Sequence, residues 1–269
     1  MRANPETIPA AANEGELQLL CPAQGGSLPL RIYRGPRSRA HPALVYLHGG
    51  DFASGSQDDA TAIARALSDT ATVVTVGYPL APASVFPHTL EACFPVLAWV
   101  AEHAKALRID PMRLYIGGEQ AGGALAASLA MIARDRLFDR AKTRRLAGQV
   151  LISPLLDPAQ ATPSLREAGD HPARQAWASY IVRPGDFNHP YASPLRSRRL
   201  AGMPPCLLLT AHDDPLRDEA KLYGRGLQSA GVPVQLQHLA SSAVTGAGRT
   251  ALVQARAERI RDFLSGKTA

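Results

Sequence analysis

A glycine-dense turn between an apolar strand and an alanine-rich helix constrains this chain more than any other stretch. Residues 113–116 form an apolar run typical of a buried strand, and residues 124–134 form a pattern typical of a helix. Between them, Gly118 and Gly122 flank Gln120 at the spacing of the G-x-S-x-G turn. So sharp a turn leaves no room for Cβ atoms beside the central residue, which explains the glycines. The centre is a glutamine, so the turn carries no hydroxyl or thiol.

The rest of the chain predicts strands that alternate with helices. Residues 16–21 and 28–33 are expected to pair as an antiparallel hairpin around the glycines at 25 and 26. Further apolar runs predict buried strands at 43–47, 72–76, 150–154, 205–210 and 234–239. Helical patterns lie at 59–67 (with Asp58 or Asp59 near the N-cap), 88–104, 218–230 and 251–264. This order predicts an α/β fold: a mostly parallel sheet of about eight strands with helices on both faces.

A length of 269 residues fits a single domain, residues 1–269, with a short N-terminal arm at residues 1–15. Residues 157–204 differ from the rest because they are rich in proline and contain one expected helix, at about 173–181. In such a sheet, an insertion at this point lies over the carboxyl ends of the strands, where ligands bind. It is a candidate lid, and the alternative is a surface excursion without a ligand role.

Charge and composition exclude several function classes. The net charge of +6 comes from scattered arginines without interleaved aromatic residues, which favours a solvated basic face over a nucleic-acid groove. No apolar run approaches the ~20 residues of a membrane helix, and the first sixteen residues lack the apolar core of a signal peptide. Cys21, Cys93 and Cys206 are far apart and lie among apolar residues. We expect small buried thiols in a reducing compartment, the cytoplasm.

Five motifs occur in an order that resembles one known family. The chain is similar to the hormone-sensitive-lipase-like branch of the α/β-hydrolase fold over about residues 27–265. The motifs are His48-Gly49-Gly50-Asp51-Phe52, Tyr78-Pro79-Leu80-Ala81-Pro82 with Phe86-Pro87, residues 117–123 followed by Leu125-Ala126-Ala127, Ser193-Pro194-Leu195, and Asp214-Pro215-Leu216-Arg217-Asp218-Glu219.

The resemblance implies a catalytic triad whose positions are only partly retained. Family members are mostly carboxylesterases with a serine at the turn, an aspartate in the D-P-L-R-D stretch and a histidine after the last strand. The corresponding residues here are Gln120, Asp214 and Val244. A carboxamide and an aliphatic side chain supply neither a nucleophile nor a base for acyl transfer. His238 falls within the expected last strand, about six residues too early, and is expected to be a packed strand residue.

The resemblance also implies an oxyanion hole made of backbone N–H groups, those of Gly50, Asp51 and Ala121. Gln120 is longer than serine and is expected to reach into this region and partly fill it. Asp51 replaces a family glycine, and its carboxylate points either inward, where it would oppose a developing negative charge, or toward solvent.

The other conspicuous residues have structural explanations. We expect His48 to hydrogen-bond the neighbouring backbone, Tyr78 to belong to a structural turn, and Asp214 to accept N–H groups of the following helix. His212 and Asp213 beside Asp214 do not make a metal site, because adjacent residues of an extended segment point in opposite directions. We expect no metal and no cofactor.

Three functions are compatible with these observations, and the sequence leaves open whether the chain is an enzyme. The first, which we favour at this point, is a non-hydrolytic protein that binds a small apolar or acyl-like molecule or a protein partner. The second is an enzyme of another reaction type, such as an elimination or cyclisation, in the same pocket. The third is a carboxylesterase or lipase-like hydrolase with an unrecognised nucleophile. The last helix, at 251–264, is compatible with a homodimer.

Overall fold

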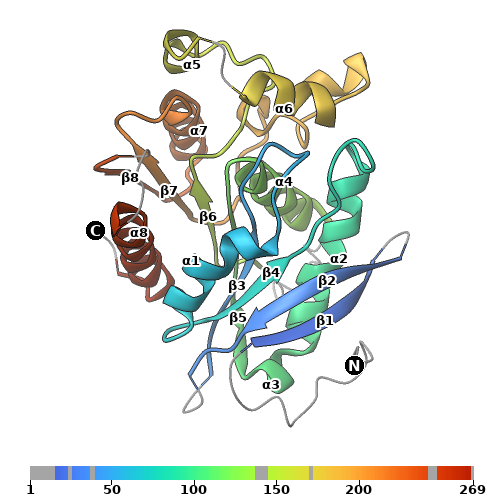
Figure 1. Cartoon of the computed structure of the whole chain (residues 1–269), viewed down its shortest axis with the longest axis vertical. Coiled ribbons are helices and arrows are strands. Elements are labelled where there is room, and N and C mark those ends of the chain that lie inside the picture. The colour runs from blue at the N-terminus through green and yellow to red at the C-terminus, as the bar shows by residue number, and fades with distance from the viewer. Residues whose placement is uncertain are drawn as a thin grey trace.

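One mixed sheet runs through the molecule (Figure 1). The computed structural model describes residues 16–23, 26–36, 40–136, 145–169, 172–241 and 247–267. Within these ranges eight strands form the sheet in the order β1-β2-β4-β3-β5-β6-β7-β8. The strands are β1 (Glu16–Ala23), β2 (Gly26–Tyr33), β3 (His41–Leu47), β4 (Thr72–Val76), β5 (Ile109–Glu119), β6 (Gly148–Ile152), β7 (Cys206–Ala211) and β8 (Val234–Leu239). β1 pairs antiparallel with β2 and β2 with β4, and all other neighbours are parallel. The predicted fold class is confirmed.

The helices follow the predicted alternation, with shifted boundaries. They are η1 (Gln57–Ala60), α1 (Thr61–Leu67), α2 (His88–Glu102), α3 (Ala104–Leu107), α4 (Ala121–Arg136), α5 (Pro163–Glu167), α6 (Ala173–Tyr180), η2 (Pro184–Asn188), η3 (Pro194–Arg196), α7 (Arg217–Ser229) and α8 (Ala247–Leu264). The predicted helix at 88–104 ends at Glu102, and the last helix begins at Ala247 instead of 251. No helix in the described ranges is both long and apolar enough to cross a bilayer.

The start of the first predicted helix was placed wrongly. We expected a helix at 59–67 with Asp58 or Asp59 near its N-cap, whereas α1 begins at Thr61 with Ala60 at its N-cap, and Ser56 caps the preceding η1. The Ser56 hydroxyl accepts the N–H of Asp58 at 3.2 Å, and the Asp59 carboxylate accepts the N–H of Ser56 at 2.7 Å. This reciprocal capping box satisfies two N–H groups that the first turn leaves unpaired.

The two faces of the sheet support two separate apolar cores. Successive side chains of a strand point to opposite faces, so a strand covered on both sides is apolar throughout. In β3, Leu44 and Tyr46 pack with α1 and α8, whereas Val45 and Leu47 pack with α2, α4 and α7. This double coverage explains the unbroken apolar runs in the sequence.

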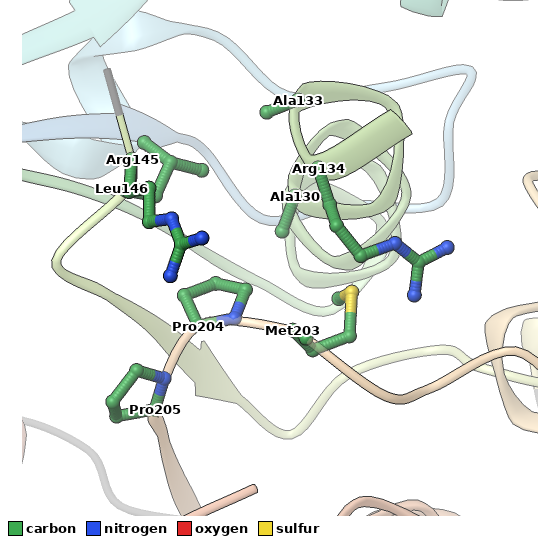
Figure 2. A pocket seen from close by; sticks show the side chains of 9 residues that line it. Ala130, Ala133, Arg134, Arg145, Leu146, Met203, Pro204 and Pro205 are labelled. Carbon is green, nitrogen blue, oxygen red and sulfur yellow. The ribbon is translucent and has the colours of Figure 1, made fainter. Parts of the chain in front are cut away.

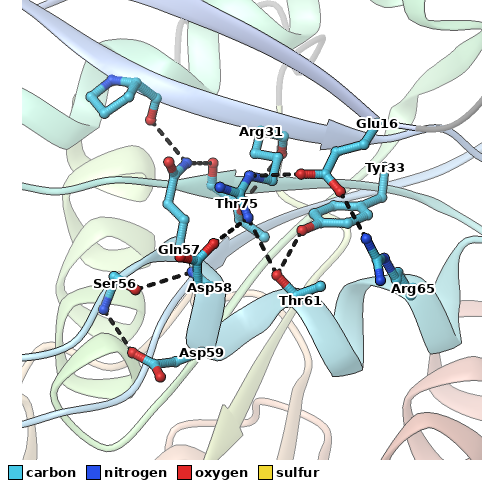
Figure 3. Close-up of polar contacts among 11 residues, drawn as sticks. Glu16, Arg31, Tyr33, Ser56, Gln57, Asp58, Asp59, Thr61, Arg65 and Thr75 are labelled. Atoms are coloured by element: carbon cyan, nitrogen blue, oxygen red, sulfur yellow. Dashed lines mark hydrogen bonds and ion pairs between the residues drawn. The ribbon is translucent and has the colours of Figure 1, made fainter.

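A polar network ties the antiparallel edge of the sheet to the first helix (Figure 3). Arg31 on β2 lies 2.8 Å from the Glu16 carboxylate on β1 and 2.6 Å from the Asp58 carboxylate on η1. The hydroxyls of Tyr33 and Thr61 lie 3.0 Å apart beside it. The guanidinium joins three segments, so these contacts fix how η1 and α1 lie against β2.

The insertion at 157–204 packs on the loop that follows β3. It contains α5, α6, η2 and η3, and α6 matches the helix predicted at about 173–181. The ring of Phe52 stacks on Tyr180 with centroids 4.2 Å apart and lies 4.9 Å from the ring of Trp177. The N–H of Phe86 donates to the carbonyl of Tyr180 at 3.0 Å. These contacts hold α6 beside the carboxyl ends of the central strands.

The turn from β5 to α4 is packed too closely for side chains beside its centre. A Cβ on Gly122 would overlap the carbonyl oxygens of Leu47 and His48, at the end of β3. A Cβ on Gly118 would overlap the Gly122 backbone and the Leu47 carbonyl. The steric role predicted for these glycines is therefore confirmed.

A buried carboxyl on α7 ties down the loop after β6. Oε2 of Glu219 accepts the N–H of Leu156 at 2.6 Å and that of Asp157 at 3.1 Å, and Oε1 is buried without a partner. Burial raises the pKa of Glu219 to about 8. The two backbone hydrogen bonds oppose this shift, and the charges of Asp157 and Asp214 add to it.

Replacement of Gly122 by alanine should destabilise the fold severely. The new Cβ would overlap backbone carbonyls that cannot rotate away, so we expect a loss of about 3 kcal/mol or more in the free energy of unfolding. Gly185→Ala is the matched control, because a Cβ there meets nothing within 4 Å. Urea denaturation measures both, and a Gly122→Ala midpoint close to that of Gly185→Ala would contradict the packing described.

Glu219→Gln should remove one cause of the loss of stability as the pH rises from about 4.5 to 8. The pKa of Glu219 is about 8 in the folded chain and 4.5 ordinarily. The contribution of the protonated carboxyl to the free energy of unfolding is therefore complete below pH 4.5 and is lost as the pH rises through 8. The free energy of unfolding of the parent should therefore fall relative to that of the variant, by up to about 1.4 kcal/mol per pH unit. Urea midpoints at pH 5, 6.5 and 8 measure this, with exposed Glu258→Gln as the control. Parallel curves for parent and Glu219→Gln would contradict the prediction.

Candidate functional site

The centre of the β5–α4 turn presents Gln120 at the carboxyl edge of the sheet. Its backbone is left-handed, with φ of 50°, and its side chain is exposed. The N–H of Gln120 donates to the Ile152 carbonyl at 2.9 Å, and its carbonyl accepts the N–H of Leu155 at 3.1 Å. The turn is thus held to the end of β6 on both sides. A strained backbone held by its neighbours is common at functional sites.

The Gln120 carboxamide reaches the region expected for the oxyanion hole. Its Oε1 accepts the N–H of Gly50 at 3.1 Å. The N–H of Ala121, another expected donor, is directed at the Gly50 carbonyl at 3.3 Å. Within the described residues, the Gln120 Nε2 group has no hydrogen bond. The carboxamide oxygen therefore accepts one of the expected backbone donors, the N–H of Gly50, and the Nε2 hydrogens of the same side chain are available in its place.

The Asp51 carboxylate folds back on its own loop. Its Oδ1 accepts the N–H of Ala53 at 3.1 Å and the hydroxyl of Ser54 at 2.7 Å. Burial works to raise the pKa of this carboxyl, but the hydrogen bonds from Ser54 and Ala53 outweigh it and leave the pKa below its ordinary value. We expected the carboxylate to point either inward or toward solvent; it is held by its own loop, on a half-buried residue that lines the cavity described below. The contact with Ser54 was not predicted, and its only signal in the sequence is the place of Ser54 three residues after Asp51.

His48 and Tyr78 have the structural roles expected of them. Nδ1 of His48 lies 2.8 Å from the Gly49 carbonyl, the Tyr78 hydroxyl donates to the His48 carbonyl at 3.1 Å, and the two rings stack at 4.1 Å. Burial lowers the pKa of His48, which favours the neutral imidazole, and burial raises the pKa of Tyr78. Both residues stabilise the turn and carry no charge near neutral pH.

Asp214 is buried and fully bonded. Its Oδ1 accepts the N–H of Leu216 at 2.8 Å, just before α7, as expected for a helix-capping acceptor. Its Oδ2 accepts the hydroxyls of Ser153 and, at 3.2 Å, Thr210. Ser153 follows β6 with φ of 43°, and its contact with Asp214 was not predicted from the sequence. Among the described residues, the Asp214 carboxylate is thus contacted by two hydroxyls and one backbone N–H.

The two histidine positions considered beforehand do not complete a triad in the described residues. Val244 lies outside them. His238 lies on β8 in register with Thr210, and its ring stacks on His212 at 5.0 Å. Burial and the charges of His212 and Lys221 lower the pKa of His238. Within the described ranges it has no hydrogen bond to Asp214.

A cavity of about 240 Å³ opens between the loop after β3, the β5–α4 turn around Gln120 (the elbow) and α6. One side is polar and contains Gln120, Asp51, Ser54 and the Gly50 backbone. The other side is apolar and is made by Leu155, Pro172, Ala173, Ala176 and Leu216. The insertion at 157–204 thus supplies part of the wall. A polar rim that faces an apolar wall suits a small molecule with one polar end.

A second cavity, of about 170 Å³, lies where β6 and β7 begin, far along α4 from the elbow. Figure 2 shows the side chains of Arg134 and Arg145 beside Met203 and Pro204. The Arg134 guanidinium donates to the carboxylate of Asp135 and to the carbonyl of Arg199, so it is engaged in structural contacts. The polar residues of the site described above lie at the opposite end of the strands, where the parallel strands terminate.

Proteins of known activity resemble this chain over most of its length. It is 36% identical to an ethyl acetate hydrolase of Pseudomonas putida over 226 residues, which span 79% of this chain and 69% of that protein. It is 35% identical to an esterase of Mycobacterium tuberculosis over 233 residues, 82% of this chain and 71% of that protein. The solved structure of EstE1, a thermostable carboxylesterase from a metagenomic library, superposes with a TM-score of 0.81 at 32% identity, covering 96% of this chain and 91% of that chain.

These relatives overturn our favoured expectation of a non-hydrolytic binding protein. Esterases at 35 and 36% identity over about four-fifths of the chain support a hydrolase, the third of the functions considered. The error lay in treating the substitutions at the family's nucleophile and histidine positions, Gln120 and Val244, as decisive. A carboxamide at Gln120 excludes attack from that position only, and an ester can be attacked by an oxygen that lies elsewhere in the cavity.

The family assignment follows from the fold and from these matches. A family model described as alpha/beta hydrolase fold matches residues 44–243, which include the loop after β3, the elbow and Asp214. The strand order, the elbow and the esterase relatives agree with this match. The chain belongs to the α/β-hydrolase-fold family, in its hormone-sensitive-lipase-like branch.

Proposed function

We propose that this protein hydrolyses small carboxylic esters in the cavity between the loop after β3, the elbow and α6. The observation that carries this proposal is the coincidence of two facts. The relatives at 35 and 36% identity are named as esterases, and the cavity of this chain lies at the elbow that the shared fold provides. One relative is named for ethyl acetate, an ester of a two-carbon acid.

The lining of the cavity fits an ester with a short acyl group. The apolar wall of Leu155, Ala173, Ala176 and Leu216 suits the hydrocarbon part, and a volume of about 240 Å³ limits its length. The polar side offers hydrogen-bond groups for the carbonyl. A long fatty acyl chain would extend beyond the enclosed space into solvent, so its extra methylenes would gain little from burial.

Ester hydrolysis needs a donor for the oxygen that becomes negative in the transition state. In our proposal the Gln120 carboxamide has this role, because its Oε1 is fixed by the Gly50 N–H and its Nε2 hydrogens have no other partner among the described residues. Amide side chains serve as oxyanion donors in other hydrolases. Retained Asp214 then supports the architecture by fixing Ser153, Thr210 and the start of α7.

We also propose that the protein resides in a reducing compartment such as the cytoplasm. Cys21, Cys93 and Cys206 are free and buried. Burial raises the pKa of the Cys21 thiol to about 11 and raises those of Cys93 and Cys206 as well, so little reactive thiolate forms. Such thiols act as small apolar side chains.

Hydrolysis of p-nitrophenyl acetate by the purified protein tests the proposed function, and an obstructed cavity makes the test specific. Ala176 on α6 lines the cavity, whereas Ala178 on the same helix is exposed. We expect Ala176→Phe to lower kcat/KM at least about tenfold, because the ring fills space that the acyl group needs. Ala178→Phe should match the parent. Thermal unfolding of each variant establishes that it is folded.

Acyl length gives a second readout in the same assay. The acetate and butyrate esters should be hydrolysed with a higher kcat/KM than the decanoate ester, measured below the solubility limit of each. An absence of hydrolysis above the buffer rate by the folded parent would contradict the proposed function. Equal loss in Ala176→Phe and Ala178→Phe would move the reaction away from this cavity.

A further inference from the structure

Ser54 is the hydroxyl that the cavity presents to a ligand. Among the described residues that line the cavity, it is the one with a hydroxyl group. Its side chain is exposed, and its Oγ lies 2.7 Å from Oδ1 of Asp51, which also lines the cavity. A hydroxyl and a carboxylate at this distance form the pair that a nucleophile and its base require.

We propose that Ser54 is the nucleophile of this ester hydrolase and that Asp51 accepts its proton. The proposal rests on the proposed function and adds the attacking atom that the elbow lacks. It concerns a residue outside the turn in which the fold usually places its nucleophile.

Gly50 contacts both Ser54 and Gln120. A Cβ on Gly50 would overlap the Ser54 carbonyl, so the two backbones are in contact, and Gly50 itself has φ of 133°. The N–H of the same Gly50 donates to the Gln120 carboxamide. Gly50 therefore contacts both the residue that carries the attacking hydroxyl and the carboxamide that would donate to the ester carbonyl oxygen.

The loop that carries Ser54 is fixed at its other end by a buried ring. Phe52 has φ of 65°, an uncommon conformation for an aromatic residue, and its ring packs against Tyr180 and Trp177 of α6. Asp51 and Ser54 flank this anchored residue. Strain that persists because its surroundings enforce it is a feature of preorganised sites.

Among the described residues, two other serine hydroxyls donate to an aspartate carboxylate, and both fit the role less well. The Ser153 hydroxyl donates to Asp214, but Ser153 is buried and does not line the cavity. The Ser241 hydroxyl donates to Asp213 at 2.6 Å, and neither residue lines the cavity. Ser54 combines the paired carboxylate with access to the space in which the ester would lie.

The reaction balances with these groups and water. Oγ of Ser54 attacks the ester carbonyl carbon while its proton passes to Asp51, and the carbonyl electron pair moves to the oxygen facing the Gln120 Nε2 hydrogens. Collapse of this intermediate expels the alcohol, which takes the proton from Asp51, and leaves an ester of Ser54. Water then attacks that ester and gives one proton to Asp51. Collapse of the second intermediate releases the carboxylic acid, and the Ser54 oxygen takes the proton back from Asp51, which restores the hydroxyl and the carboxylate.

The identity of the base sets the pH dependence. The hydrogen bonds that hold Asp51 ionised also make it a weaker base than an imidazole, so turnover should be slow. Its carboxylate remains ionised throughout the neutral range. The enzyme-dependent rate should therefore be flat between pH 6 and 8, whereas a histidine base would give an inflection near its ordinary pKa of about 6.5.

Two serine-to-alanine variants with matched local contacts test the assignment. Ser54→Ala should lower p-nitrophenyl acetate hydrolysis at least about tenfold, toward the buffer rate. Ser241→Ala loses the same kind of serine–aspartate hydrogen bond outside the cavity and should match the parent. Asp51→Asn, which keeps an acceptor oxygen but takes up no proton, should also lose most activity. Circular dichroism and thermal unfolding confirm that each variant is folded.

Covalent labelling supplies a readout that does not depend on turnover. An alkyl p-nitrophenyl phosphonate should release one p-nitrophenolate per chain and leave an adduct on Ser54, located by fragmentation of the peptide. Ser54→Cys, which should be alkylated by iodoacetamide at the new thiol, keeps the assignment testable if Ser54→Ala does not fold. An adduct on Ser153, or parent-like hydrolysis by folded Ser54→Ala, would overturn the assignment and leave the proposed function intact. Absence of hydrolysis by the parent would instead overturn the proposed function.

Discussion

The close approach of α4 to the end of β3 is the constraint on which the site depends. Gly122 lies against the carbonyl oxygens of Leu47 and His48, so β5 must turn sharply into α4 at this point. That turn places Gln120 beyond the sheet edge and within 3.1 Å of the Gly50 N–H. The cavity, its polar side and the loop after β3 all take their positions from this contact between backbones.

Sequence pattern was sufficient for most of the architecture. Strands covered on both faces leave unbroken apolar runs, and the glycines of the elbow mark a turn that only they can make. Helix ends were less predictable, because Ser56 competes with Asp58 and Asp59 as a cap and all three are common N-cap residues. Contacts distant in sequence, such as Glu219 with the loop after β6, leave no periodic signal.

The site was predictable only where a motif fixed it. The resemblance located Gln120, Asp214 and the loop after β3, but the partners of these residues depend on three-dimensional packing. The bond of Ser153 to Asp214 joins the ends of two strands, and the bond of Ser54 to Asp51 depends on the fold of one loop. The expected loss of hydrolysis was wrong because the residue types at two family positions were equated with the function of the whole chain, whereas the esterase relatives support a hydrolase.

The ring stack between Phe52 and Tyr180 has a consequence for how this protein can diverge. One ring belongs to the loop with Asp51, and the other to the inserted segment that forms the apolar wall. A substitution in the apolar wall that makes room for a bulkier ligand would shift Tyr180. Because Tyr180 stacks on Phe52, the loop that carries the polar side of the cavity would shift as well. Residues 52 and 180 should therefore covary among descendants of this gene. A chimaera that takes the insertion from a homologue should also take that homologue's residue at position 52.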